Sequence, residues 1–173
     1  MFLCKLAPAA LVSASMLAGL TMGDDDSRYR DLVQLRQLQE KFHGASTKAD
    51  VKMMASIWTQ DAVFSGGGNV VKGRDKIVDF FRRGANWGKA ANLAPTYKST
   101  FQIKGNKATI QFECVIVKVD GSSPLTTALS SLPPGSQNSK VEIVQHSNTT
   151  IEAVRRGADW KIRSFTGKGG AIK

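Results

Sequence analysis

The chain has 173 residues, of which 42% are hydrophobic and 22% are charged. This is enough for one globular domain that buries a core without disulfide staples. The formal net charge is +10, but only the pairs Arg82-Arg83 and Arg155-Arg156 place basic residues side by side. No basic stripe interleaved with aromatic residues is present, so the sequence argues against a specific nucleic-acid partner. It favours either a solvated basic face or loose attraction to anionic surfaces.

The first 23 residues differ from the rest of the chain. Lys5 is their only charged residue, and an apolar run extends from Leu6 to Leu20. The run is short for a membrane span, so residues 1–23 are predicted to be a signal peptide and the protein to be secreted or periplasmic. The mature chain is expected to begin between about Ala18 and Ser27. An uncleaved N-terminal anchor is the alternative.

The domain predicted over residues 27–173 begins with helices. Acidic residues and Ser27 are suitable N-terminal caps for a helix, and an amphipathic helix is expected from there to His43. The segment Gly44–Asp50 is predicted to end this helix, and Asp50 to cap a short second helix. The apolar residues expected on the second helix are Val51, Met53, Met54, Ile57 and Trp58.

Beyond the second helix the pattern changes to strands. Residues 62–65 and 69–71 flank three glycines and predict a small hairpin, and residues 74–81 predict a third helix. Residues 84–92 are expected to be a loop. Long strands are then predicted over 95–103, 107–119, 140–154 and 160–165, with a mobile loop at 120–139.

Two isolated residues invite a chemical interpretation. Asp61 is interpreted as a turn residue that ends the second helix, with a general base as the alternative. Cys114 lies in an apolar run and is expected to be a buried thiol. Two histidines, His43 and His146, and one cysteine in the mature chain give no metal cluster, so we predict neither a metal nor a cofactor.

Helices followed by long antiparallel strands predict an α+β fold in which a strongly curved antiparallel sheet packs around the helices as a cone. The order of elements, the stretch from Ala49 to Phe81 and the closing "TTIEAVRRGADWKIRSF" resemble the SnoaL-like, nuclear transport factor 2-like superfamily. The resemblance covers nearly the whole chain after about residue 27. The resemblance implies no single activity. The concave sheet itself predicts a pocket between the sheet and the first helix.

The resemblance allows a residue-by-residue test for catalysis. A ketosteroid isomerase-like site needs a tyrosine and two aspartates, a tuned set that is a worked example of environment-controlled pKa values. Phe42, Gly66 and Thr149 stand at or beside those positions, so the triad is missing. The strand motif of limonene epoxide hydrolase and the paired histidines of a scytalone dehydratase-like site are also missing.

Inward-facing residues give better candidates for a site. If this strand faces the same way as in the superfamily, every second side chain from Val141 to Ile151 points inward, and His146 and Asn148 point outward. A bulge would exchange the two faces. The predicted ligand-binding residues are Gln39, Phe42, Trp58, Gln145, Ser147 and Thr149.

His43 is the candidate catalytic residue. It shares the inward face of the first helix with Gln39, and histidine titrates near neutral pH. The alternative is that His43 only caps the end of the helix. Two functions therefore stay open: binding of a small, largely apolar ligand, and a cofactor-independent lyase or isomerase that uses His43 as general acid or base.

The resemblance also implies a homodimer. Val115, Val117 and Val119 are expected on the outer face of the sheet, where they would form an exposed apolar area.

Overall fold

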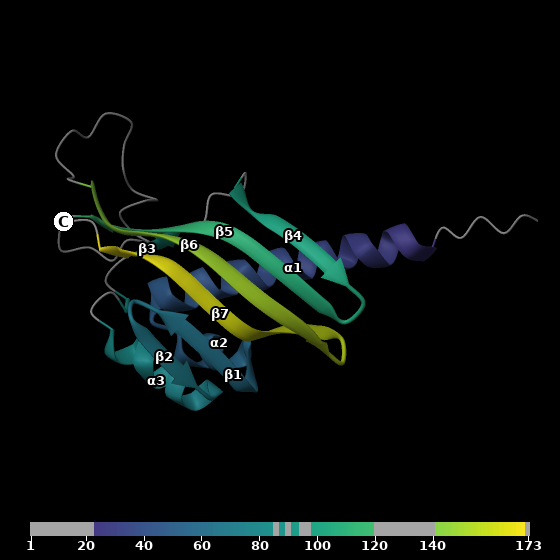
Figure 1. Ribbon diagram of the computed structural model, residues 1–173, viewed down its shortest axis with the longest axis horizontal. Coiled ribbons are helices and arrows are strands. Elements are labelled where there is room, and N and C mark those ends of the chain that lie inside the picture. Colours follow the sequence, from purple (N-terminus) through teal and green to yellow (C-terminus); the bar gives the residue numbers. More distant parts are fainter. Residues whose placement is uncertain (1–22, 85–86, 89–90, 94–97, 120–140, 172–173) are drawn as a thin grey trace, which may run out of the picture.

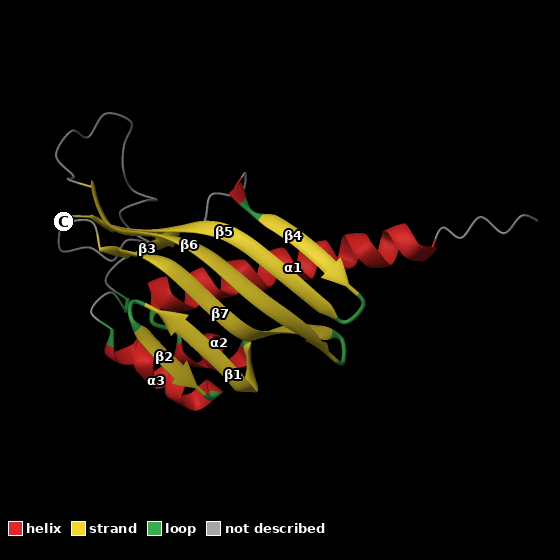
Figure 2. Ribbon diagram, viewed as in Figure 1, coloured by secondary structure: helices red, strands yellow, loops and turns green. Residues whose placement is uncertain are grey.

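A computed structural model describes residues 23–84, 87–88, 91–93, 98–119 and 141–171. Within these residues, three helices pack against one sheet, as Figures 1 and 2 show. The predicted signal peptide (residues 1–23, apart from Gly23) and the predicted loop at 120–139 lie outside the described residues. Among the described helices, none is long and apolar enough to cross a membrane.

The helices are α1 (Gly23–Lys48), α2 (Val51–Ser56) and α3 (Arg74–Arg83). The strands are β1 (Trp58–Gly66), β2 (Asn69–Lys72), β3 (Ala91–Leu93), β4 (Thr100–Lys104), β5 (Lys107–Val119), β6 (Val141–Arg156) and β7 (Asp159–Ala171). The sheet order is β2-β1-β7-β6-β5-β3, and β4 also pairs with β5. All pairings are antiparallel except that of β1 with β7.

The long α1 crosses one face of the sheet, and α2 and α3 lie beside the β1–β2 hairpin (Figure 1). This is the α+β architecture expected from the sequence, in which the curved sheet and the helices enclose one core. Fully buried side chains come from every layer, so helices and sheet share that core. The largest of them are Leu35, Met54, Ile57, Ile77, Ile110, Ile151 and Ile162.

The predicted end of the first helix is wrong. Gly44 does not terminate α1, which continues to Lys48. Ala45 and Ser46 are both buried. Tertiary packing therefore stabilises this turn against the low helix propensity of glycine. The helix ends instead at Ala49, whose φ of 56° is left-handed, and the Asp50 amide donates to the Ala45 carbonyl at 2.9 Å. Such a left-handed residue is a common way to end a helix. His43 is therefore not the last residue of the helix.

Asp50 caps α2 as predicted, and its Oδ1 accepts from the Met53 amide at 2.9 Å. The expected role of Asp61 is wrong, because α2 ends at Ser56 and Asp61 lies exposed within β1. It sits where the register of β1 against β7 shifts, between Trp58 and Val63. An exposed carboxylate outside the core has no enclosed substrate to deprotonate.

The outer face of the sheet differs from the expected apolar surface. Val117 is only 8% exposed and Val115 is half-buried, while the side chain of Val119 lies outside the described residues. Within the described chain, the exposed large hydrophobic residues are Tyr29, Val33, Val51 and Val70, all outside β5. The homodimer therefore stays a prediction that rests on the resemblance alone, and light scattering in solution tests it.

Candidate functional site: an aromatic cavity at one end of the cone

A cavity of about 210 Å³ opens between α1, α3, the β1–β2 hairpin and strands β5 to β7. Its walls are mainly aromatic. Phe165 is central to them, with its ring centroid 4.9 Å from that of Phe42 and 5.2 Å from that of Phe64. Such tilted and offset contacts are the arrangements that aromatic rings prefer. The lining aromatic residues are Phe42, Phe64, Phe80, Phe81, Trp87 and Phe165.

Glycines make room for this cavity. Five of them line it, and the hairpin and β7 supply four of the five. At Gly169, where φ is 144°, a Cβ would lie 2.3 Å from the His146 carbonyl oxygen and 2.8 Å from Ser147 Cα. Only glycine allows β7 to approach β6 this closely. The lining glycines are Gly66, Gly67, Gly84, Gly167 and Gly169.

The last turn of α1 forms another wall and holds the loop that carries Trp87. Ser46 lines the cavity, and its backbone carbonyl accepts a hydrogen bond from the Gly88 amide at 3.0 Å. The Trp87 amide donates to the Gly84 carbonyl at 3.1 Å, which continues the chain from the end of α3. The unexpected extension of α1 thus positions two cavity walls.

The polar side chains in the described lining are few and uncharged. They come from Ser46, Asn69 and Ser147, and no charged residue among those that the structure describes lines the cavity. Cys114 also lines it, and burial raises the pKa of this thiol to about 12. The thiol is therefore protonated at neutral pH and is a poor nucleophile. The described lining offers hydrogen bonds and apolar contact, and none of its side chains is charged at neutral pH.

His43 lies behind this cavity rather than in its lining. It is 7% exposed, and its ring packs edge-on against Phe42 and Phe112 with both centroid distances at 5.3 Å. Burial lowers the pKa of His43 to about 4, and a hydrogen bond with the Gln39 backbone offsets this in part. Within the described chain, Nε2 has no hydrogen-bond partner. The imidazole is therefore neutral at physiological pH.

The structure divides the predicted ligand-binding residues into two groups. Phe42 and Ser147 line the cavity, whereas Gln39, Trp58 and Thr149 are buried without lining it. Gln39 Nε2 donates to Ser99 Oγ at 3.1 Å, and Trp58 Nε1 donates to Met54 Sδ at 3.4 Å. Gln145 belongs to β6, but its side chain lies outside the described residues.

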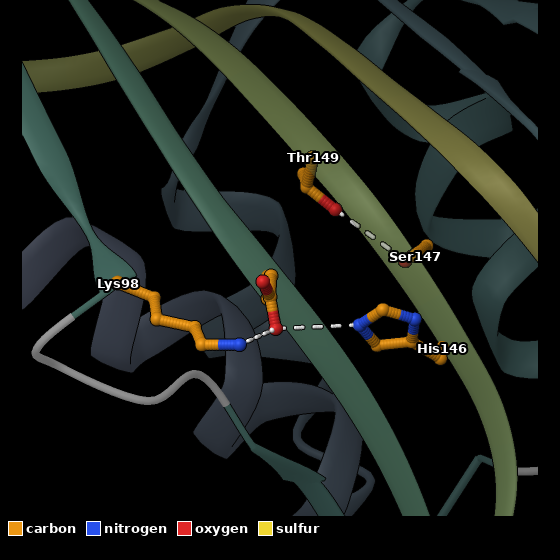
Figure 3. Close-up of polar contacts among 5 residues, drawn as sticks. Lys98, His146, Ser147 and Thr149 are labelled. Carbon is orange, nitrogen blue, oxygen red and sulfur yellow. Dashed lines mark hydrogen bonds and ion pairs between the residues drawn. The ribbon is translucent and has the colours of Figure 1, made fainter.

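Side chains along the described part of β6 alternate between buried and exposed, as the sequence predicts. Ser147, Thr149 and Ile151 are buried, and His146 and Asn148 are exposed. Figure 3 shows the Ser147 and Thr149 hydroxyls close to each other on this strand, with an Oγ to Oγ1 distance of 3.5 Å. The register of β6 against β5 shifts opposite Ile116 and Val117, beyond these residues.

The other face of β5 and β6 carries Glu113 and His146, and Lys98, just before β4, reaches the same face. Glu113 Oε2 lies 2.6 Å from Lys98 Nζ and 3.4 Å from His146 Nε2 (Figure 3). Lys98 first, and His146 second, hold the pKa of Glu113 below its usual range. All three side chains are partly exposed to solvent. Since the cluster lies on the open outer face, it takes no part in the cavity.

Several lining residues could not be assigned to a site from the sequence alone. Phe64, Phe80 and Phe81 have the pattern of ordinary core residues, and only the unfilled space beside them makes them a site. Trp87 falls in a segment expected to be a loop. One signal was available: glycines recur in the hairpin and in "TGKGG", and such repeats in strands mark close backbone approach or missing side chains.

Comparison with known proteins identifies the family. Residues 27–166 match the SnoaL-like domain, and the chain belongs to this family. No curated protein matches the chain.

Solved structures share the fold at low identity. A variant of Rv3472 from Mycobacterium tuberculosis is 16% identical, with a TM-score of 0.66 over 86% of this chain and 76% of that one. An NTF2-like protein with a cystatin-like fold from Novosphingobium aromaticivorans is 16% identical, with a TM-score of 0.65 over 87% and 90%. The hexachlorocyclohexane dehydrochlorinase LinA-type3 from Novosphingobium barchaimii LL02 is 17% identical, with a TM-score of 0.62 over 86% and 94%.

Proposed function

We propose that this protein is an exported SnoaL-like domain that binds a small, largely apolar molecule in its aromatic cavity. One observation carries the proposal: six aromatic residues line the cavity, and none of the charged residues that the structure describes does. Aromatic walls with a few placed polar groups are typical of small-molecule sites. Burial of a ligand's apolar surface against them supplies the affinity.

The volume limits the size of the ligand. An apolar protein cavity of about 150 Å³ holds benzene. At about 210 Å³, this cavity has room for one substituted ring or two fused rings. Because the walls are flat aromatic rings, a planar ligand gains more contact area and offset stacking than a globular one.

The chemistry of the lining favours binding over turnover. Proton transfer requires a titrating group within hydrogen-bond reach of the substrate. The only titratable side chain in the described lining is Cys114, whose raised pKa of about 12 keeps it as a thiol. The ligand is therefore expected to leave unchanged.

Titration calorimetry with 2-methylnaphthalene, a neutral hydrocarbon of two fused rings, tests the proposal. We expect saturable binding with one site per chain. Trp87→Ala removes one wall and should weaken binding about tenfold, the effect of losing part of an aromatic contact. Tyr29→Ala is the matched control, because Tyr29 is 67% exposed on α1 and does not line the cavity. Absence of binding by the unaltered protein would contradict the proposal.

A second candidate function is acid-base catalysis by His43. It is favoured by His43 Nε2, which has no hydrogen-bond partner among the described residues, and by the contact of the imidazole ring with Phe42, a residue of the cavity wall. One of the solved structures that share this fold is that of a hexachlorocyclohexane dehydrochlorinase. If His43 reaches a substrate, His43→Gln should lower turnover by about a hundredfold while the fold persists. Unchanged ligand binding and an absence of turnover in both proteins would reject this candidate.

Export is a separate part of the proposal and depends on the apolar run after Lys5. N-terminal sequencing of protein recovered from its source should find a first residue between about Ala18 and Ser27. An intact Met1 on exported material would instead support an anchor.

A further inference from the structure

Two hydroxyl groups interrupt the aromatic lining of the cavity. Ser46 is 6% exposed on α1, and Ser147 is 7% exposed on β6. Both line the cavity, so they approach its contents from the helix and from the sheet. Each hydroxyl provides one donor and two acceptor positions.

The protein itself uses little of this hydrogen-bonding capacity. Ser147 Oγ meets Thr149 Oγ1 at 3.5 Å (Figure 3). This separation is at the outer limit of a hydrogen bond. The described hydrogen bond of Ser46 is made by its backbone carbonyl, which accepts from the Gly88 amide, and its side chain lines the cavity. A hydroxyl that faces the cavity can form a hydrogen bond with a ligand, and a ligand that supplies a well-placed partner gains affinity.

We propose that the cavity selects neutral aromatic molecules that carry a hydroxyl or carbonyl group, which hydrogen-bonds to Ser46 and Ser147. This inference rests on the proposed ligand-binding function and names its ligand class. The aromatic body of such a molecule fills the space between the phenylalanine rings. Its polar substituent faces the two serines, which fix its orientation.

The cavity also excludes charged analogues. A carboxylate or ammonium group taken from water into this space meets no opposite charge among the described lining residues. Burying an unpaired charge is far costlier than burying a neutral hydroxyl. The expected order of affinity is therefore a neutral phenol first and an aromatic carboxylate last.

An isosteric pair of ligands tests this proposal. In 2-naphthol a hydroxyl stands where 2-methylnaphthalene has a methyl group, so the two fill nearly the same space. A hydroxyl without a partner in the cavity would make 2-naphthol the weaker ligand, because it loses its hydrogen bonds to water. We expect the unaltered protein to bind 2-naphthol at least as tightly as 2-methylnaphthalene, and 2-naphthoate far more weakly than either.

The double variant Ser46→Ala/Ser147→Ala should shift the affinity ratio about tenfold towards 2-methylnaphthalene, the scale of one or two hydrogen bonds. Thr59→Val is the matched control: it removes a buried strand hydroxyl that does not line the cavity and should leave the ratio unchanged. Circular dichroism checks that each variant is folded. Binding of 2-methylnaphthalene with an unchanged ratio in the double variant would overturn this inference alone, whereas binding of neither ligand would overturn the proposed function itself.

Discussion

At the residue scale, His43 shows how burial controls charge. Its ring is buried between two phenylalanines. The charged form therefore loses its hydration without gaining an anionic partner. Desolvation is the larger effect on the pKa, and the hydrogen bond to the Gln39 backbone restores only part of the basicity. The residue that most resembles a catalytic acid or base in the sequence is thus held neutral.

This burial makes stability depend on pH. The pKa of His43 is lowered from its ordinary value of 6.5 to about 4 in the folded state. Between these values the unfolded chain binds the proton more readily than the folded chain does. The free energy of unfolding is therefore highest, as far as this group is concerned, above pH 6.5, and it decreases as the pH falls towards 4. We expect a loss of about 3 kcal/mol in the free energy of unfolding, measured by urea denaturation across this range.

One histidine variant and one neutral control separate this effect from other titrations. His43→Gln should flatten the pH dependence above about pH 5, where carboxylates contribute less. Asn148→Gln should leave it unchanged, because Asn148 is exposed on the outer face of the sheet and carries no ionisable group. A pH profile that does not respond to His43→Gln would show that the imidazole is solvated.

At the element scale, α1 is fixed to the sheet by a buried carboxylate near its start. Asp31 is 8% exposed, and its Oδ1 accepts hydrogen bonds from Arg155 and from Trp160 Nε1, the latter at 3.1 Å. The Arg155 guanidinium also stacks over the Trp160 ring, 4.9 Å from its centroid. A helix from one end of the sequence is thereby joined to the β6–β7 hairpin at the other.

Removing this carboxylate should destabilise the protein. Asp31→Ala leaves the Arg155 charge and the indole N–H without their partner, and we expect a loss of about 2 kcal/mol. The figure is below that for a fully buried pair because the Arg155 side chain is 35% exposed. Solvent screens a pair of this kind. Thermal unfolding of the variant measures the loss, and Asp26→Ala, an exposed substitution on the same helix, is the control. Equal stability of the two variants would contradict the role of Asp31.

The end of α1 carries a second testable feature. Ala49 is the only described residue other than glycine with a positive φ, at 56°. The left-handed conformation disfavours a Cβ. Ala49→Gly should therefore stabilise the protein by about 1 kcal/mol. Ala55→Gly, within α2, should destabilise it by a similar amount because glycine costs stability inside a helix. Urea midpoints that shift in the same direction for both variants would show that the αL strain is absent.

These elements also show what the sequence can and cannot predict. Strand β5 was expected over residues 107–119 and is observed at Lys107–Val119. The reason is that an alternating pattern follows an unambiguous Gly105-Asn106 turn. The sequence predicts that β7 ends at residue 165, but the strand continues to Ala171. Its glycines are poor strand formers, and the hydrogen bonds to β6 stabilise this part of the strand. Local signals fix an element where they agree, and tertiary contacts decide where they conflict.

At the whole-molecule scale, the cavity exists because side chains are absent where several elements meet. The curved sheet leaves a space at the end of α1, and glycines from the hairpin, the end of α3 and β7 leave it unfilled. No single segment encodes this space, which explains why the fold could be predicted from the sequence while most of the cavity lining could not. In an ordinary close-packed core, larger side chains at these glycine positions would fill the space.

Filling the space should therefore abolish binding without unfolding the protein. Gly167 is the suitable position, because its φ lies outside the left-handed region and an added Cβ would meet only the edge of Phe165 at 3.4 Å. In Gly167→Leu the new side chain occupies the cavity, and we expect at least about a tenfold loss of affinity for 2-methylnaphthalene. The thermal midpoint should stay the same or rise, since apolar surface is buried in an existing void.

Lys168→Leu is the matched control for this substitution. Lys168 is the next residue of β7 and is exposed, so the change adds the same side chain to the opposite face. Its affinity for 2-methylnaphthalene should equal that of the unaltered protein. If Gly167→Leu binds the hydrocarbon as tightly as Lys168→Leu does, the ligand occupies some other place, and the aromatic cavity cannot be the binding site.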